Sequence, residues 1–251
     1  ACNSSDLSHI LCLERMIKML EIKDLKKRFG AKQVLNGVDL KVPEHSVFGF
    51  VGQNGAGKTT TMKMILGLLA SDEGEIYING ERVTCGSNKT NKYVGYLPDV
   101  PEFYDYMTAT EYLDFCGSVT GMGIAQKKER IKEMLILVGL EKEEKRIKGF
   151  SRGMKQRLGI AQALLNKPLL LICDEPTSAL DPVGRKEILE VLSAAKQDTT
   201  VLFSTHILSD IEKICDHIAL LHDGKILLSG TMEEVKNTHK NRDSQNLELS
   251  L

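Results

Sequence analysis

The feature that most constrains this chain is the segment GQNGAGKT at positions 52–59. It fits the spacing G-x-x-x-x-G-K-[ST] completely. The apolar stretch SVFGFV comes directly before it, and TTMKMILGLL, with apolar residues at helical spacing, comes directly after it. A strand, a glycine-rich turn and a helix in this order form a phosphate-binding loop, so the sequence predicts an α/β fold built around an anion site.

Each residue type in this loop has a physical role. The glycines let backbone amides close around phosphate oxygens, because a Cβ would block the approach or the positive φ that the turn requires. Lys58 places a charge between β- and γ-phosphates, Thr59 offers a hydroxyl to Mg²⁺, and Thr60 adds a hydroxyl near the α-phosphate. We therefore expect a nucleoside triphosphate to be surrounded by Gly52, Asn54, Gly55, Ala56, Gly57, Lys58, Thr59 and Thr60.

A second stretch, LLLICDEPTSALDP at 169–182, supplies carboxylates. Its continuous apolar run predicts a buried strand that ends in Asp174 and Glu175, and ligands of open parallel sheets bind at that carboxyl edge. Asp174 is placed to hold Mg²⁺ through water, and Glu175 to orient or deprotonate an attacking water. Two acidic residues after a strand are weak evidence for a catalytic site by themselves. The phosphate loop in the same chain makes that interpretation stronger.

A third strand, within TVLFSTHIL at 200–208, ends in Ser204, Thr205 and His206. A histidine in this position is usually a helix cap or a surface residue. Because this strand is expected in the same sheet as the phosphate loop, we predict that His206 forms a hydrogen bond to the γ-phosphate.

The segment GFSRGMKQRLG at 149–159 predicts a second anion site. Ser151 is a good N-cap residue, and the free amides of a helix N-terminus carry a partial positive charge. Such a terminus binds anions readily. The sequence therefore raises the question of why one small domain needs two phosphate sites.

Composition narrows the class of protein. The 251 residues are 42% hydrophobic and 27% charged, which is ordinary for a globular protein of one large or two small domains. A net charge of −1 gives no support to nucleic-acid binding by bulk electrostatics. The six cysteines include no CxxC pair, which favours a reducing, intracellular compartment. No apolar run reaches the roughly 18 residues needed to cross a bilayer.

Hydrophobic periodicity predicts the order of the elements. Apolar or alternating runs indicate strands near 19–25, 33–40, 46–51, 75–78, 92–97, 169–173, 200–204, 217–222 and 225–230. Helical spacing appears near 58–69, 108–119, 125–138, 153–166, 183–196 and 207–213. The later alternation of strand and helix predicts right-handed βαβ units and a parallel sheet.

The same pattern divides the chain. Residues 19–236 form the expected main domain, in which about 100–155 has no clear strand and forms a helical subdomain. Residues 1–18 fit this domain poorly, and we interpret them as a leader or upstream leftover, with a short amphipathic docking helix as the alternative. Residues 237–251 are a polar tail.

Together these motifs resemble the nucleotide-binding subunit of an ABC transporter, over about residues 19–236. Walker A corresponds to 52–59, Walker B to 169–174 with Glu175 as the catalytic residue, the D-loop to SALD at 178–181, and the switch histidine to His206. FSRGM at 150–154 falls where the family has its signature, usually LSGGQ. Phe29 falls where the family stacks an aromatic ring on adenine. Without the resemblance, we would interpret Phe29 as a core residue at the end of a strand.

The resemblance implies an α/β fold: a P-loop NTPase core with a mostly parallel central sheet, an N-terminal antiparallel β subdomain and an inserted α-helical subdomain. It also implies that two copies pair head to tail, with each ATP held between the P-loop of one and the signature of the other. Ser151 and Gly153 would then cradle the γ-phosphate bound by the partner. The second phosphate site would be half of a shared one.

The implied partners are a second ATPase subunit and an integral-membrane transporter subunit, at the cytoplasmic face of the membrane, and no nucleic acid. The segment PEFYDYMTATEYLDF at 101–115 is rich in aromatic residues. These rings either fill the core of the helical subdomain or form the surface on which the membrane subunit docks.

Two departures from the family pattern are visible. The signature has Arg152 in place of Gly and Met154 in place of Gln, and VGYLPDVPEFY has Asp99 where the family has Gln. Asp99 can still accept a hydrogen bond from a metal-bound water, so we keep it as a Mg²⁺ ligand beside Thr59 and Asp174. These variants are similar to the export-type branch linked to drug, antibiotic or lipid efflux.

Two other functions stay open from the sequence. A non-transport ABC ATPase of translation or DNA repair usually carries two cassettes in one chain or long coiled coils, and this chain shows neither. An ATP-gated regulator with little turnover is the other alternative, and the presence of Glu175 argues against it. The transported substrate cannot be read, because the ATPase subunit does not touch it.

Overall fold

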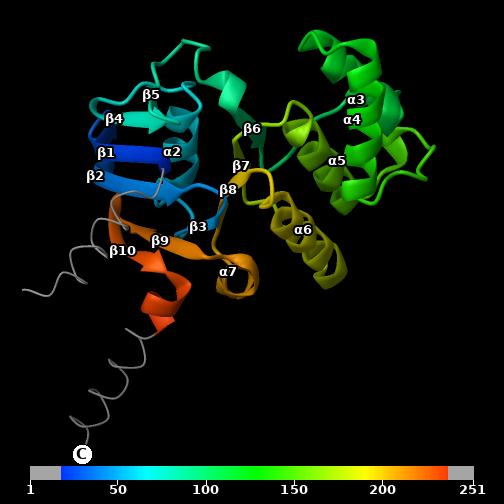
Figure 1. The fold of residues 1–251 in the computed structure, drawn as a ribbon. Helices are drawn as coiled ribbons and strands as arrows, with labels where there is room; N and C mark the ends of the chain where they lie inside the picture. The colour runs from blue at the N-terminus through cyan, green and yellow to red at the C-terminus, as the bar shows by residue number, and fades with distance from the viewer. Residues whose placement is uncertain (1–17, 237–251) are drawn as a thin grey trace, which may run out of the picture.

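The computed structural model describes residues 18–236, which form two lobes (Figure 1). Residues 1–17 and 237–251 lie outside the described residues, and with them nearly all of the predicted leader and the whole of the predicted polar tail. The first strand, β1 (Lys18–Phe29), begins one residue before the expected start of the main domain.

The first sheet is antiparallel. It contains β1, β2 (Lys32–Pro43), β4 (Glu73–Ile78) and β5 (Glu81–Arg82) in the order β2-β1-β4-β5. The predicted N-terminal antiparallel subdomain is confirmed. The sequence did not predict β5, because two residues are too few to show a period.

The second sheet is mostly parallel, as predicted. Its order is β10-β9-β3-β8-β7-β6, and every neighbouring pair is parallel except β9 with β10. The strands are β3 (Val47–Val51), β6 (Val94–Leu97), β7 (Leu170–Asp174), β8 (Thr200–Thr205), β9 (His217–His222) and β10 (Lys225–Thr231). All residues of β3, β7 and β8 are buried, which explains their continuous apolar sequences.

The helices are α2 (Lys58–Ile65), α3 (Ala109–Val119), α4 (Ile124–Leu137), α5 (Arg152–Leu164), α6 (Pro182–Ala195) and α7 (Leu208–Ile214). The prediction of a first helix over 58–69 was too long, because Gly67 adopts φ +67° directly after Leu66 and ends α2. The strand predicted from 92 begins at Val94, after a 3-10 turn at Asn91–Tyr93.

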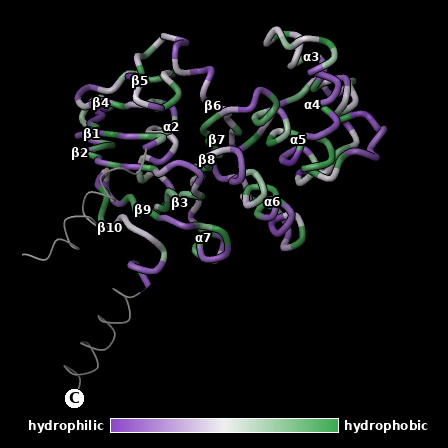
Figure 2. Tube along the Cα trace, viewed as in Figure 1, coloured by the Kyte–Doolittle hydropathy of each residue, from purple (hydrophilic) through white to green (hydrophobic). Residues whose placement is uncertain are grey.

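The parallel sheet separates two hydrophobic cores. One face, with Phe48 and Phe50 of β3, packs against α2 and the antiparallel sheet. The other face, with Val47 and Val51, packs into a core shared with α3 to α7. Figure 2 shows the apolar character of these strands and the polar segments that connect them. Because neighbouring strands are parallel, the carboxyl ends of β3, β6, β7 and β8 meet at one edge of the sheet.

Candidate functional site

The glycine-rich loop links β3 to α2, and its glycines are needed for two different reasons. Gly55 and Gly57 adopt φ values of +83° and +112°, which L side chains rarely adopt. Gly52 has no such φ, but a Cβ there would lie 2.6 Å from the carbonyl oxygen of Leu221 in β9. The loop therefore needs Gly52 for close packing and Gly55 and Gly57 for its backbone turn.

Lys58, the first residue of α2, points into the loop. Its side chain is only 6% exposed, and Nζ donates a hydrogen bond to the Gly52 carbonyl at 2.6 Å. Nζ also lies 3.1 Å from Oε1 of Glu175. A buried ammonium held by carbonyls and one carboxylate is a preformed cation at the floor of the site.

The two acidic residues lie where predicted, at the end of β7, and a serine organises them. In the β7–β8 register Asp174 is opposite Ser204. The Ser204 hydroxyl donates to Oδ1 of Asp174 at 2.6 Å and accepts a hydrogen bond from the Glu175 amide at 3.0 Å. The sequence alone does not predict a role for Ser204; the pairing of β7 with β8 supplies one.

His206 lies next to Glu175. Its Nδ1 is 2.9 Å from Oε2 of Glu175, and its side chain is 45% exposed. Glu175 thus contacts Lys58 with one oxygen and His206 with the other. This contact brings the two predicted catalytic groups together with the lysine of the loop, at the common edge of β3, β7 and β8.

A cavity of about 510 Å³ lies over these residues. Its lining residues are Phe29, Lys32, Val34, Asn54, Gly55, Gly57, Lys58, Thr59, Thr60, Asp99, Asp174 and Glu175. The predicted residues Gly52, Ala56, Ser151, Gly153 and His206 do not line it. Lys32 and Val34 were not predicted; Lys32 reaches the cavity because β1–β2 pairing places it opposite Phe29.

Phe29 is exposed at the rim of this cavity. The residue is 51% exposed at the end of β1, so the interpretation of Phe29 as a core residue was wrong. Lys27 lies beside the ring, with its Nζ 5.6 Å from the ring centroid. An exposed ring at a cavity rim can stack on a flat ligand.

Asp99 follows β6 and also faces the cavity. Partial burial raises the pKa of its carboxyl group, the Arg152 guanidinium opposes this shift, and the nearby Asp174 and Glu175 add to it. Within residues 18–236 no group of three or more His, Cys, Asp or Glu side chains is arranged to hold a metal ion. Thr59, Asp99 and Asp174 do line the cavity, and their oxygen atoms are of the type that Mg²⁺ prefers.

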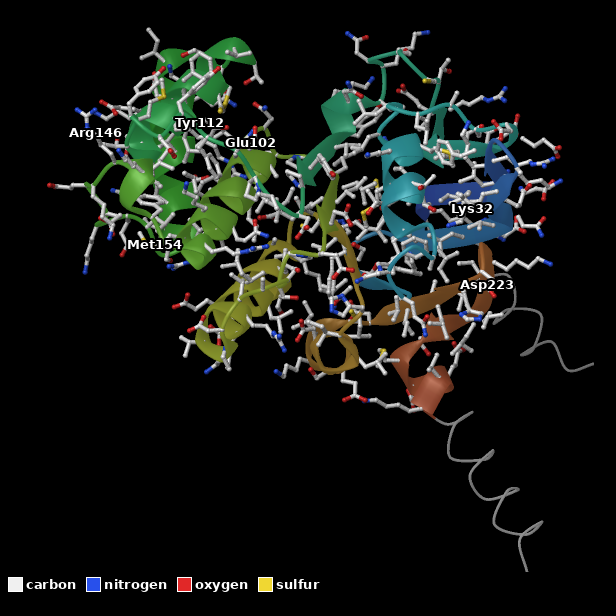
Figure 3. All side chains as sticks on the ribbon, turned by 180° about the vertical axis from the view of Figure 1, so that it is seen from behind. Lys32, Glu102, Tyr112, Arg146, Met154 and Asp223 are labelled. Atoms are coloured by element: carbon white, nitrogen blue, oxygen red, sulfur yellow. The ribbon has the colours of Figure 1, made fainter. Side chains whose placement is uncertain are left out.

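The second predicted anion site is the N-terminus of α5. Ser151 is its N-cap and accepts a hydrogen bond from the Met154 amide at 3.2 Å. Met154 lies in the lobe that contains α3 and α4, whereas Lys32, at the cavity, lies in the other lobe (Figure 3). Ser151 and Gly153 do not line the cavity over Lys58, but the next residue after the cap, Arg152, lies 3.8 Å from Asp99, which does.

The aromatic segment divides into core and surface. Tyr112 is buried in the helical lobe and contacts Phe103 edge to face. Tyr104 and Phe115 are exposed, contact each other, and line a second cavity of about 470 Å³. The core interpretation therefore holds for Tyr112 but not for Tyr104 and Phe115, which are exposed. In the part of the chain that is described, no helix has the length and apolar character of a membrane span.

Comparison with known proteins assigns the family. A family model described as ABC transporter matches residues 35–178. The chain belongs to the ABC transporter family. It is 45% identical over 219 residues to the uncharacterized ABC transporter ATP-binding protein YxlF of Bacillus subtilis, a match that covers 87% of this chain and 72% of that protein.

Two further relatives agree. The bacitracin transport ATP-binding protein BcrA of Bacillus licheniformis is 41% identical, over 94% of this chain and 76% of its own length. A solved ATP-binding subunit of an ABC transporter is 34% identical with a TM-score of 0.78, over 93% of this chain and all of that structure. The chain is therefore an ABC-type ATPase, a transporter's ATP-binding subunit, and the translation and repair alternatives are not favoured.

Proposed function

We propose that this subunit acts as one of two copies that power a separate membrane subunit, and that the transporter exports an antibiotic or a lipid-like compound. The observation that carries the ATPase part is the contact of Glu175 with both Lys58 and His206, at the edge of a cavity large enough for a nucleotide. The export part is supported by the relationship to BcrA, whose name assigns it to bacitracin transport.

Hydrolysis depends on a change of partner at Lys58. In the structure its ammonium contacts the Gly52 carbonyl and Glu175. A γ-phosphate carries more negative charge than either partner, so Lys58 binds it instead and releases an oxygen of Glu175. The freed carboxylate accepts a proton from the attacking water. In the structure Nδ1 of His206 lies 2.9 Å from the other oxygen of Glu175; once the nucleotide is bound, His206 donates its N–H to the γ-phosphate.

Mg²⁺ would be held by Thr59 and Asp174, with Asp99 acting through water. When bound, the ion neutralises the charge that develops on the phosphates. Ser204 supports this assignment, because its hydroxyl donates to Oδ1 of Asp174 and leaves the second oxygen of that carboxylate for a metal-bound water.

The second copy completes the nucleotide site. Ser151 and Gly153 lie outside the cavity of their own chain, and Ser151 is exposed. A helix N-terminus with an exposed cap is suited to an anion that arrives on another surface. Head-to-tail pairing would bring the α5 terminus of one copy to the γ-phosphate of the other.

The membrane subunit would dock beside Tyr104 and Phe115. Both rings are exposed and border the second cavity. Exposed aromatic rings that border a cavity are typical of protein contact surfaces. Through this partner the subunit would be held at the cytoplasmic face of the membrane.

Resistance to bacitracin tests the export proposal. A sensitive bacterial host would express the subunit with the membrane protein encoded beside its gene, either as wild type or as Lys58→Ala. We expect the wild type to raise the inhibitory concentration of bacitracin and Lys58→Ala to leave it unchanged, because a transporter without ATP turnover cannot export. Equal sensitivity with and without the wild-type pair would contradict bacitracin as a substrate.

Docking is tested separately by co-purification with that membrane protein. Tyr104→Asp and Phe115→Asp should reduce recovery of the complex. Ile136→Asp, at an exposed apolar residue of α4 that lines neither cavity, is the matched control. Undiminished recovery with both aromatic variants would place the docking surface elsewhere.

A further inference from the structure

The two departures from the family pattern are neighbours in the structure. Asp99 follows β6, and Arg152 is the first residue of α5. Arg152 Nη2 lies 3.8 Å from Asp99 Oδ1, and each side chain is about half exposed. The family pattern has neutral residues, Gln and Gly, at these positions. The two departures therefore place opposite charges 3.8 Å apart.

The packing of α5 fixes this geometry. Gln156, one turn after Arg152 on the same helix face, is 1% exposed and donates to the carbonyl oxygens of Asp99 at 3.1 Å and of Pro176 at 3.2 Å. The first turns of α5 are thus tied to the backbone of Asp99 and to the backbone directly after Glu175.

Close helix–strand contact holds the same register further along α5. A Cβ on Gly159 would lie 2.5 Å from Cδ1 of Leu97, the last residue of β6. A Cβ on Gly95 would overlap the carbonyl group of Ala163. Because glycine is needed on both sides of this contact, α5 and the Asp99 loop have little freedom to separate.

The charges around the cavity explain what Arg152 contributes. Three carboxylates line it, those of Asp99, Asp174 and Glu175. Lys58 lies 3.1 Å from Glu175, and Ser204 donates to Asp174. In the described part of the chain, Asp99 Oδ1 is buried without a hydrogen-bond partner and forms an ion pair with Arg152.

We propose that Asp99 and Arg152 act as one charge pair, in which Arg152 is a positioning residue that holds Asp99 and offsets its charge beside the nucleotide. Without Arg152, an uncompensated carboxylate would face the triphosphate and repel it. The pair replaces two neutral residues with two charges that cancel. This proposal rests on the assignment of the nucleotide to the cavity that contains Lys58.

Nucleotide affinity of the monomer tests the pair. Equilibrium binding of a fluorescent ATP analogue with Mg²⁺ would be measured for the full chain at concentrations where it is monomeric, so that no α5 from a second copy takes part. Arg152→Gly and Arg152→Gln should each weaken binding about fivefold, the upper range for a partly exposed ion pair. Arg152→Gln guards against a change in helix propensity caused by glycine.

Rescue distinguishes a charge pair from a structural effect. Asp99→Gln combined with Arg152→Gly restores the neutral pattern and should return the affinity to within about twofold of wild type, a non-additive result expected for residues in contact. Arg152→Lys should keep most of the affinity. The loss caused by Arg152→Gln should also shrink at high salt, because partly exposed charges are screened.

A neighbouring ion pair provides the control. Lys155, in the same helix, lies 3.3 Å from Asp105, and neither residue lines the nucleotide cavity. Lys155→Ala should leave ATP affinity unchanged. Equal losses in Arg152→Gly and in the double variant would overturn the pair, as would wild-type affinity in both Arg152 variants. Failure of the wild type to bind ATP would instead refute the nucleotide site itself.

Discussion

The phosphate loop and the N-terminal cap of α5 were both predicted to bind anions, but only the loop lines a cavity of its own chain. At the loop, the side chain of Lys58 is 6% exposed and points into a cavity of about 510 Å³. At α5, Ser151 is exposed, its hydroxyl is occupied by the Met154 amide, and it lines no part of that cavity. The loop is preorganised within the chain, whereas we propose that the α5 terminus acts on the nucleotide of a second copy.

Backbone strain marks the same difference. Gly57 has φ +112° and Glu175, a non-glycine residue, has φ +48°. Such conformations persist only where the surroundings hold them, and they are common at functional sites. The cap at Ser151 has an ordinary extended backbone, φ −66° and ψ 164°. The phosphate loop and Glu175 thus hold left-handed backbone conformations, whereas the cap of α5 does not.

The largest expected effect is at the phosphate-loop site, where Glu175 contacts Lys58. Glu175→Gln keeps the shape and one hydrogen-bonding oxygen but removes the base, so turnover should fall by on the order of 100-fold or more. ATP binding should remain, and the variant should accumulate as an ATP-loaded dimer in sizing chromatography. Glu212→Gln, at an exposed glutamate of α7, is the matched control. Turnover near the wild-type rate in Glu175→Gln would remove Glu175 from its role.

Mixing two inactive chains tests whether Ser151, at the N-terminus of α5, acts on the nucleotide of the other chain. Lys58→Ala and Ser151→Arg are each expected to be inactive. If each site uses Lys58 of one chain and Ser151 of the other, a mixed dimer has one site with both defects and one intact site. ATP hydrolysis or ATP-dependent dimerisation should then partly recover on mixing. With both variants folded, recovery of neither signal means that Ser151 serves its own chain.

Phe29, at the rim of the cavity that the phosphate loop lines, provides a further test. Phe29→Ala should weaken ATP binding roughly tenfold, since stacking of a base on an aromatic ring contributes about 1–3 kcal/mol. The melting temperature of the nucleotide-free protein should change little, because the residue is 51% exposed. Calorimetry of the apo protein and a binding titration measure the two quantities. A large loss of stability with unchanged binding would contradict the stacking role.

The smallest effect compares two helix caps. Ser151→Ala and Thr108→Ala each remove an N-cap, whose side chain accepts from the amide of Met154 or of Glu111. Each should lower the free energy of unfolding by about 1 kcal/mol, measured by urea titration. Only Ser151→Ala should also weaken ATP-dependent dimerisation. If both variants weaken it equally, the α5 terminus contributes through stability alone.

Much of the fold could be predicted from the sequence, because local patterns determine it. The burial of β3 and β7 on both faces appears as continuous apolar runs, and the loop between β3 and α2 appears as a spaced set of glycines. Errors arose where the local signal was short or ambiguous. The two-residue β5 has no period, and Gly67 ended α2 inside an apolar run that continued to Leu69.

The sequence by itself determined the order of the elements, the phosphate loop, and the residues expected at the carboxyl edge of the sheet, because these depend on spacing along the chain. Only the tertiary structure decided which of them touch. The contact of Glu175 with Lys58 and His206 and the pairing of Asp99 with Arg152 depend on strand register and on how closely α5 packs against β6. Those distances arise from packing between segments remote in sequence, and no local pattern records them.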